Sequence, residues 1–140
     1  MCIVSDKSKL VYICSPYRTG NVDENVKRAR EYCHLAVEEG FVPVAPHLLY
    51  PQFLNDGDES QREAGMQCGL ELLAVCAEIW VFDYNYESRG MNCEIAFAKD
   101  IGVPVKFIKT EVIYHLDGHQ SLRLVYPSMF AIGGDVDCCE

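Results

Sequence analysis

A glutamate behind a short Ser/Gly loop is the group in this sequence with the clearest chemical use. Glu94 lies in the run Ser88–Ala98, directly after the apolar segment Ile79–Phe82. A carboxylate in the first turns of a helix that follows a strand lies where open α/β sheets bind their ligands. Glu94 is therefore a candidate nucleophile or general base. Its alternative role is that of a solvated residue that complements the helix dipole.

A second set of polar residues suits a small anion. Ser15, Tyr17 and Arg18 follow one apolar segment, and Ser88 and Gly90 follow another. Loops after neighbouring parallel strands meet at the same edge of a sheet, so we expect the two sets to face each other. A guanidinium, hydroxyl groups and the free amides of a helix start together favour phosphate. The alternative is a tight turn with an ordinary helix cap.

The elements that must position these residues alternate between strand and helix. Apolar segments rich in β-formers predict four strands, at Leu10–Cys14, Phe41–Ala45, Glu78–Phe82 and Val103–Ile108. The proline in the second of them favours a strand at the edge of the sheet. Parallel strands joined by helices require right-handed crossovers. We therefore expect an α/β fold, a single doubly wound parallel sheet of the flavodoxin-like or Rossmann-like type with helices on both faces.

Helix boundaries and domain extent follow from capping signals. Asn21 with Glu24, and Ser60 with Glu63, have the spacing of capping boxes, and Gly102 is suited to end the helix that carries Glu94. Residues 1–140 are taken as one domain with its core at about 9–109. The tail of residues 110–140 is expected to hold a last strand at 122–126 and a loose segment at 133–137.

Composition excludes several classes of protein. The formal net charge of −9 and pI near 4.8 argue against a nucleic-acid polymer as partner, because phosphate neutralisation needs clustered Lys and Arg. The sequence has no apolar run of membrane-spanning length and no signal-like start, so a cytoplasmic protein is expected.

The cysteines do not follow the spacing of a closed zinc site. The sequence has eight, of which five lie in apolar patterns and are expected to behave as buried hydrophobic residues. Those five are Cys14, Cys33, Cys68, Cys76 and Cys93. His115 and His119, one helical turn apart, with Cys138 and Cys139 are the alternative metal ligands. We expect neither a metal nor a cofactor.

Two separated motifs resemble the nucleoside 2-deoxyribosyltransferase superfamily, especially its nucleoside 5′-monophosphate N-glycosidase branch. They are Val11–Arg18 (VYICSPYR), which resembles the first strand and phosphate loop, and Ser88–Ala98 (SRGMNCEIAFA), which resembles the catalytic segment. The middle of the chain, at His47–Asp56 and Arg62–Gly65, is similar to uncharacterised bacterial and phage domains placed in the same superfamily.

The resemblance implies roles for individual residues. Glu94 matches the nucleophile that attacks the anomeric carbon of a (deoxy)ribosyl group, and Tyr12 matches the tyrosine that holds this carboxylate. Ser15, Arg18, Ser88 and Gly90 match positions around a 5′-phosphate. The implied reaction is N-glycosidic cleavage of a small-molecule nucleotide or nucleoside, by hydrolysis or by base transfer, in a homodimer or larger homo-oligomer.

One departure from the family pattern leaves a second function open. The aspartate that assists the departing base is absent from the corresponding stretch Gln67–Leu72, where Glu71 is the nearest acid and is more typical of a solvated carboxylate. A non-catalytic nucleotide-binding or sensing domain is therefore the alternative. Tyr17, His47, Asp83 and Asn92 are further candidates around the cleft, although the segment around His47 is expected mainly to pack.

Overall fold

The computed structural model describes residues 9–125. Its elements, in chain order, are β1 (Leu10–Cys14), α1 (Val22–Glu38), β2 (Val42–Val44), the short 3-10 helices η1 (Pro46–Leu48) and η2 (Tyr50–Gln52), α2 (Glu59–Leu73), β3 (Glu78–Val81), α3 (Arg89–Ile101), β4 (Val105–Phe107), β5 (Thr110–Tyr114) and β6 (Gln120–Leu124).

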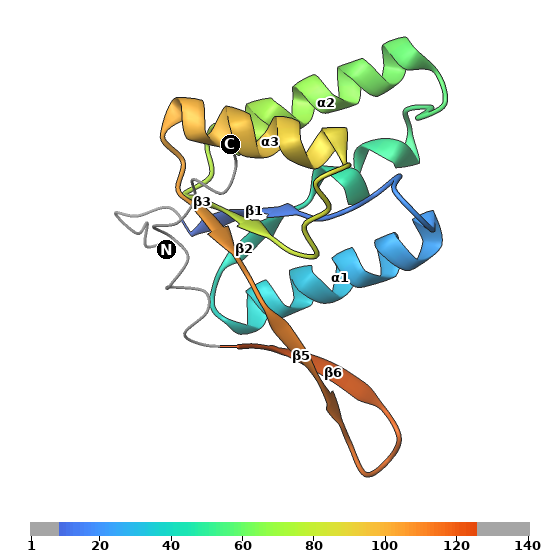
Figure 1. Ribbon diagram of the computed structural model, residues 1–140, viewed down its shortest axis with the longest axis vertical. Helices are drawn as coiled ribbons and strands as arrows, with labels where there is room; N and C mark the ends of the chain where they lie inside the picture. The colour runs from blue at the N-terminus through green and yellow to red at the C-terminus, as the bar shows by residue number, and fades with distance from the viewer. Residues whose placement is uncertain (1–8, 126–140) are drawn as a thin grey trace, which may run out of the picture.

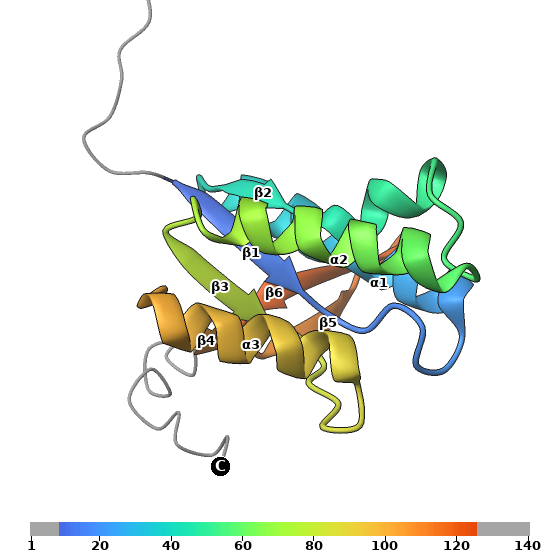
Figure 2. The same cartoon turned by 90° about the horizontal axis from the view of Figure 1, so that it is seen from above.

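Four parallel strands form the central sheet, in the order β2-β1-β3-β4. Helix α1 covers one face, and α2 and α3 lie side by side on the other (Figures 1 and 2). This confirms the predicted doubly wound α/β fold with helices on both faces. Pro43 lies in the edge strand β2, where its missing amide hydrogen leaves no bond unmade inside the sheet.

The alternation of side chains along β1 decides which residues reach the candidate site. Tyr12 and Cys14 belong to the core on the side of α2 and α3, whereas Val11 and Ile13 belong to the core under α1. Successive side chains of a strand point to opposite faces, so Tyr12 and Cys14 share one face. The Tyr12 ring is thereby buried between the sheet and helices α2 and α3, the second of which carries Glu94.

Two of the three predicted helix signals are confirmed. The Asn21 side chain accepts a hydrogen bond from the Glu24 amide at 2.9 Å and caps α1. Gly102 ends α3 in the left-handed conformation, with φ of 85°.

The capping box predicted at Ser60 and Glu63 is wrong. Helix α2 begins at Glu59, with Asp58 at the N-cap position and no side-chain cap bond. The preceding turn explains the early start, because the Gln61 side chain accepts a hydrogen bond from the Asn55 amide and so closes the loop against the first helical turn.

The segment after β4 also departs from the prediction. A strand, β6, lies where a last strand was predicted, but it pairs with β5 in an antiparallel hairpin separate from the main sheet, which projects from the body in Figure 1. Leu122 and Leu124 anchor its base on the α1 side of the core. Tyr126, at the end of the predicted strand, and residues 133–137 lie outside the described residues.

The two predicted histidine ligands do not lie on a helix, and only some of the cysteines are buried as predicted. His115 and His119 flank the turn of the hairpin, with stacked rings 4.1 Å apart, and are not on a helix as their spacing suggested. Cys14 and Cys76 are buried as expected, whereas Cys33 and Cys68 are only partly buried and Cys93 is exposed on α3. Cys138 and Cys139 lie outside the described part of the chain.

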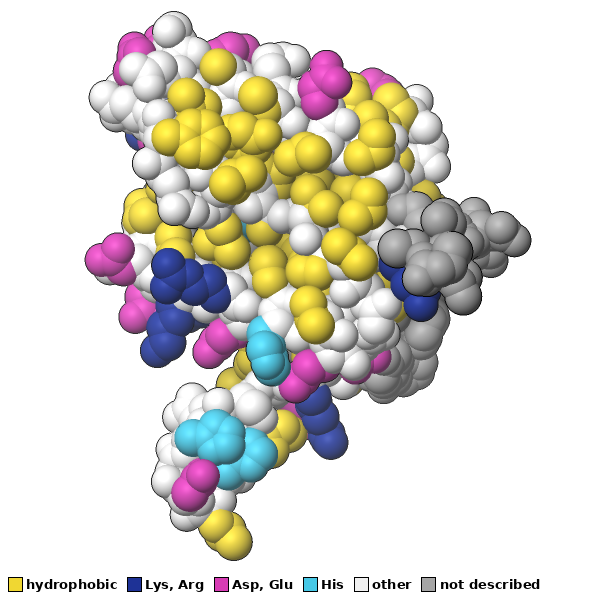
Figure 3. All heavy atoms as spheres, turned by 180° about the vertical axis from the view of Figure 1, so that it is seen from behind, with side chains coloured by type: hydrophobic (Ala, Val, Ile, Leu, Met, Phe, Trp, Pro, Cys, Tyr) yellow, Lys and Arg dark blue, Asp and Glu magenta, His cyan; other side chains and the backbone are white. Residues whose placement is uncertain are grey.

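Hydrophobic side chains also gather on the face that carries α2, the η1–η2 segment and the β2 edge (Figure 3). The exposed large hydrophobic residues of this apolar face are Val42, Leu49, Phe53 and Val75. Within residues 9–125, no helix is both long and apolar enough to cross a membrane.

Candidate active site

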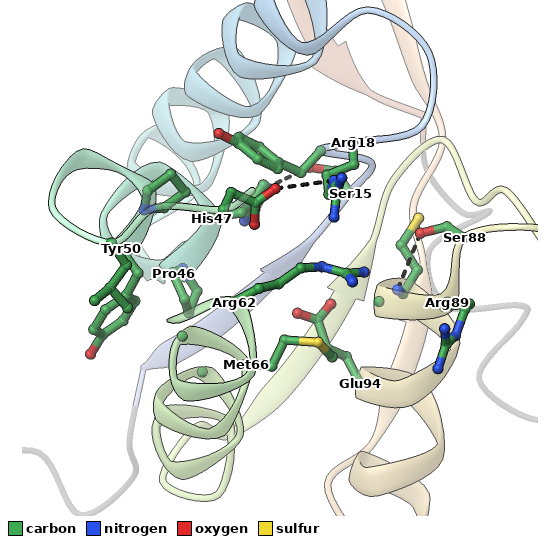
Figure 4. A pocket seen from close by; sticks show the side chains of 18 of the residues that line it. Ser15, Arg18, Pro46, His47, Tyr50, Arg62, Met66, Ser88, Arg89 and Glu94 are labelled. Atoms are coloured by element: carbon green, nitrogen blue, oxygen red, sulfur yellow. Dashed lines mark hydrogen bonds and ion pairs between the residues drawn. The ribbon is translucent and has the colours of Figure 1, made fainter. Parts of the chain in front are cut away.

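One pocket collects most of the residues singled out from the sequence. It lies beyond the carboxyl end of β1, between the loop that follows this strand, the η1–η2 segment, α2 and the first turn of α3 (Figure 4). Eight of the ten predicted site residues line it: Tyr12, Ser15, Tyr17, Arg18, His47, Ser88, Gly90 and Glu94. The folding of the chain therefore brings the predicted anion-binding loop and the predicted nucleophile to one cavity.

Side chains of strand β1 hydrogen-bond to Glu94. The Tyr12 hydroxyl donates a hydrogen bond of 2.7 Å to Glu94 Oε2. Burial raises the pKa of Glu94 to about 7, while hydrogen bonds from Tyr12 and Cys14 act in the opposite direction. Burial also raises the pKa of both donors well above their ordinary values, so the phenol and the thiol keep their protons. Glu94 is consequently a carboxylate that changes its charge near neutral pH.

The first turn of α3 presents hydrogen-bond donors to the same cavity. Ser88 is the N-cap of this helix, and its hydroxyl accepts a bond from the Met91 amide at 3.3 Å. The amides of Arg89 and Gly90 precede the hydrogen-bond ladder of the helix and add to its positive end. A Cβ atom at Gly90 would meet no other atom within 4 Å. Gly90 therefore contributes its backbone amide, and the space around it does not require a glycine.

Ser15 and His47 form the wall on the opposite side. The Ser15 hydroxyl and His47 Nε2 lie 2.9 Å apart in hydrogen-bond contact. Burial lowers the pKa of His47 to about 4, so the imidazole is neutral at physiological pH. His47 therefore fixes the direction of the Ser15 hydroxyl and adds no positive charge to the pocket.

An ion pair crosses the mouth of the pocket. Arg18 Nε lies 3.1 Å from Asp56 Oδ2, and the Arg18 side chain is half exposed. Burial and the Asp56 carboxylate raise the pKa of the neighbouring Tyr17 hydroxyl. The Asp56 carboxylate thus competes with an anionic ligand for the Arg18 guanidinium.

Asp83 and Asn92 are the two predicted candidates that do not line this pocket. Asp83, at a positive φ of 49°, accepts a hydrogen bond from Tyr32 and borders a separate surface depression beside α1. Asn92 accepts a bond from the Tyr84 hydroxyl at 2.6 Å and donates one to the Tyr86 carbonyl at 2.8 Å. Asn92 therefore shapes the loop before α3.

Several pocket residues were missed by the sequence analysis. Cys14, which hydrogen-bonds Glu94 without lining the pocket, was assigned only to the core, although its two-residue spacing from Tyr12 puts it on the same face of β1. Arg62, Met66 and Gly69 line the pocket from α2. Their spacing of four and three residues places them on one helix face, a signal that was available in the sequence.

Gly69 has a specific packing role beside Tyr12. A Cβ atom at this position would lie 3.1 Å from the Tyr12 hydroxyl oxygen and 3.5 Å from Pro46 Cβ. The missing side chain lets α2 approach the hydroxyl that holds Glu94. Glu71, the nearest acid on this helix, is exposed and does not line the pocket. Within residues 9–125, no group of three or more His, Cys, Asp or Glu side chains could hold a metal ion.

Comparisons with known proteins agree with this architecture. No curated protein matches the sequence. Among solved structures, a 2-deoxyribosyltransferase from the psychrotolerant bacterium Bacillus psychrosaccharolyticus is similar, with 18% sequence identity, 70% of each chain covered and a TM-score of 0.55. At this identity the likeness shows the fold. A family model described as a domain of unknown function, DUF7768, matches residues 9–108. Because this match covers most of the chain, the protein belongs to the DUF7768 family.

Proposed function

We propose that this protein cleaves the N-glycosidic bond of a (deoxy)nucleoside 5′-monophosphate, with Glu94 as the nucleophile. The observation that carries the proposal is the Glu94 carboxylate in a pocket, hydrogen-bonded to the buried Tyr12 at 2.7 Å. Two further observations support it: the first turn of α3 borders the same cavity, and the fold is similar to that of a 2-deoxyribosyltransferase.

The chemistry follows from the charge of the carboxylate. Departure of the base leaves an oxocarbenium-like sugar, whose positive charge an adjacent carboxylate stabilises before it forms a covalent ester. Glu94 must be ionised for this step, and a pKa of about 7 leaves a substantial ionised fraction at neutral pH. Tyr12 orients the attacking oxygen. Water then releases the sugar phosphate, or a second base accepts the sugar.

The phosphate is assigned to the side of the pocket between α3 and the loop after β1. The Ser88 and Ser15 hydroxyls lie there, together with the amide of Gly90 and the Arg18 guanidinium. Amides at a helix start and a guanidinium are strong donors to phosphate oxygens. Arg18 would leave Asp56 for the phosphate, which carries more negative charge.

The test is an assay of base release from purified protein. The protein is incubated with a panel of ribo- and deoxyribonucleoside 5′-monophosphates, and free base is separated and quantified. We expect release from at least one nucleotide, its loss in Glu94→Gln, and unchanged release in Glu71→Gln, which removes an exposed carboxylate of α2. Release that survives in Glu94→Gln would refute the mechanism.

A non-catalytic nucleotide-binding domain is the second candidate. The observation that favours it concerns leaving-group assistance: of the acids that line the described pocket, Asp56 is paired with Arg18 and Glu94 is the proposed nucleophile. Nucleotide binding by calorimetry without base release from any member of the panel would support this function and overturn the first.

We further propose that the protein is cytoplasmic and forms a homodimer or larger homo-oligomer through the apolar face. Val42, Leu49, Phe53 and Val75 expose large hydrophobic side chains there, and β2 is an edge of the described sheet. A contiguous apolar surface of this kind is typical of an interface between protein chains.

A further inference from the structure

Arg62 is a cationic group of the pocket to which the mechanism above assigns no role. It lies in the second turn of α2, lines the pocket and is partly buried. Figure 4 shows its guanidinium extended across the cavity toward the Glu94 carboxylate. No salt bridge or side-chain hydrogen bond of Arg62 is found among residues 9–125, whereas Arg18 in the same pocket has Asp56 as its partner. A partly buried guanidinium without a partner is suited to a ligand that brings negative charge.

The position of Arg62 relative to the proposed phosphate and sugar positions indicates which part of the substrate it can contact. With the phosphate between α3 and the loop after β1, the sugar extends from there to Glu94. The base must then fill the remaining side of the cavity, formed by Pro46, Met66 and Gly69. Arg62 projects from the helix of that side and ends above Glu94. In this arrangement its N–H donors would lie near the bond that joins sugar and base.

Among the described residues that line the pocket, no free carboxylic acid and no charged imidazole is available to protonate a departing base. His47 has a lowered pKa of about 4 and is neutral, and Asp56 is engaged by Arg18. The Tyr12 hydroxyl donates its hydrogen bond to Glu94, and Tyr50 points away from Glu94 in Figure 4. A guanidinium does not release a proton at neutral pH. It can only stabilise negative charge that develops on the leaving group.

We propose that Arg62 is a catalytic residue that stabilises the departing base as an anion, so that the enzyme prefers nucleotides whose bases leave readily as anions. This inference rests on the proposed N-glycosidase function. It makes the acidity of the released base a determinant of specificity, in place of proton donation by an enzyme acid.

The step balances without any further reactant. The bond from a Glu94 oxygen to the anomeric carbon forms as the carbon–nitrogen bond breaks, and the electron pair of that bond stays on the base. The resulting anion is stabilised by the Arg62 guanidinium and then takes a proton from water. A second water attacks the anomeric carbon, and the bond from this carbon to Glu94 breaks and restores the carboxylate. The proton that this water loses neutralises the hydroxide left by the first, so one water is consumed in total.

The experiment compares Arg62→Met with wild type on leaving groups of graded acidity. For pyrimidines, the series is 5-fluoro-, 5-bromo-, unsubstituted and 5-methyl-2′-deoxyuridine 5′-monophosphate. For purines, guanosine 5′-monophosphate is compared with its 7-methyl derivative, whose base leaves without negative charge. We expect Arg62→Met to lower kcat about a hundredfold for the poorest leaving base. The loss should shrink steadily as the base becomes more acidic and vanish for the 7-methyl substrate.

Two controls separate this role from a structural one. Arg62→Lys keeps the charge and should retain part of the activity on poor leaving bases. Arg30→Met makes the same change at an exposed position of α1 and should leave every rate unchanged. Equal loss on all bases in Arg62→Met, with weaker nucleotide binding, would show that Arg62 binds the phosphate and would overturn this inference alone. Absence of base release from the wild-type protein would instead overturn the proposed function.

Discussion

The Tyr12 hydroxyl and the Glu94 carboxylate are joined by a hydrogen bond of 2.7 Å that links β1 to α3 across 82 positions of sequence. The bond stabilises the ionised form of Glu94 and so lowers its pKa against the effect of burial. Tyr12→Phe should therefore move the rising limb of the pH–rate profile from about 7 to higher pH. At pH 7 we expect about tenfold slower base release, the usual size for a lost bond to a charged group. An unshifted limb would show that Tyr12 does not control this carboxylate.

The raised pKa of Glu94 also predicts a pH-dependent stability. Burial makes the folded protein bind the Glu94 proton more tightly than the unfolded chain does. The associated stabilisation is complete below about pH 4.5 and is lost as pH rises through about 7. Glu94→Gln does not titrate. The free energy of unfolding of wild type minus that of Glu94→Gln should thus decrease between these two pH values, by about 1.4 kcal/mol per unit of pKa shift at most.

Urea unfolding of both proteins at several pH values measures this difference. Subtraction cancels the effect of other groups, including His47, whose lowered pKa makes the folded state lose stability as pH falls through the range from 6.5 to about 4. Glu71→Gln, at an exposed carboxylate, should give a difference that is flat with pH. A flat difference for Glu94→Gln as well would mean that its carboxyl group is solvated.

The sequence predicts a site residue when a single strand or helix is enough to fix the direction of its side chain. Tyr12 and Glu94 were predictable because a buried strand and a helix start fix their directions, and strand alternation would have added Cys14. Asp83 lies outside the pocket lining, at a turn with positive φ where it accepts a hydrogen bond from Tyr32 of α1. That turn depends on tertiary contacts and leaves no pattern in the sequence.

Contacts between distant loops were beyond prediction for the same reason. Asp56 meets Arg18 only because the η1–η2 segment folds over the mouth of the pocket. A last strand was predicted at 122–126, where β6 lies, but its pairing with β5 was not predicted. The packing of Leu122 and Leu124 on the α1 side of the core is a tertiary contact that the sequence does not reveal. Helical spacing on α2, in contrast, would have placed Arg62 on the same helix face as Met66 and Gly69 from the sequence alone.

The ion pair between Arg18 and Asp56 predicts that two substitutions change nucleotide affinity in opposite directions. Asp56→Asn removes the carboxylate that competes with a phosphate for Arg18, so nucleotide affinity should rise. The gain should be at most about fivefold, because exposed ion pairs contribute no more than about 1 kcal/mol. Arg18→Met should weaken nucleotide binding about tenfold or more while leaving the affinity for the corresponding nucleoside nearly unchanged.

Calorimetric titration with a nucleoside and its 5′-monophosphate distinguishes these cases. The ratio of the two affinities isolates the phosphate contribution from effects on the rest of the pocket. Equal weakening of both ligands in Arg18→Met would contradict the assignment of Arg18 to the phosphate.

The apolar face predicts an effect on assembly. Phe53 is 63% exposed and packs edge-on against Tyr50, with ring centroids 5.5 Å apart. If a second copy covers this face, Phe53→Asp places an unpaired charge in the interface and should produce monomers. Light scattering after size-exclusion chromatography measures the mass. Leu116→Asp, at the exposed tip of the hairpin, is the matched control and should leave the mass unchanged. A monomeric wild type would refute the assembly.

Substitution of Gly69 by alanine should raise the stability of the protein and lower its activity. Gly69→Ala removes a flexible residue from the interior of α2, which favours the helix by about 0.5–1 kcal/mol. The new Cβ atom would lie 3.1 Å from the Tyr12 hydroxyl oxygen, so either the ring or α2 must move by a few tenths of an ångström. Because this hydroxyl holds Glu94, the displacement should slow base release and raise the pH of the rising limb, as in Tyr12→Phe.

The comparison variant is Gly65→Ala, one turn earlier on the same helix, where the added Cβ atom meets the flexible end of Leu54 at 3.4 Å. Both alanines should gain the helix propensity, and only Gly69→Ala should alter the pH profile. The double variant Gly69→Ala with Tyr12→Phe completes the argument, because without the hydroxyl there is nothing for the new methyl group to displace. The effect of Gly69→Ala on the profile should disappear in that background, whereas equal effects in both backgrounds would show that the glycine acts on the pocket independently of Tyr12.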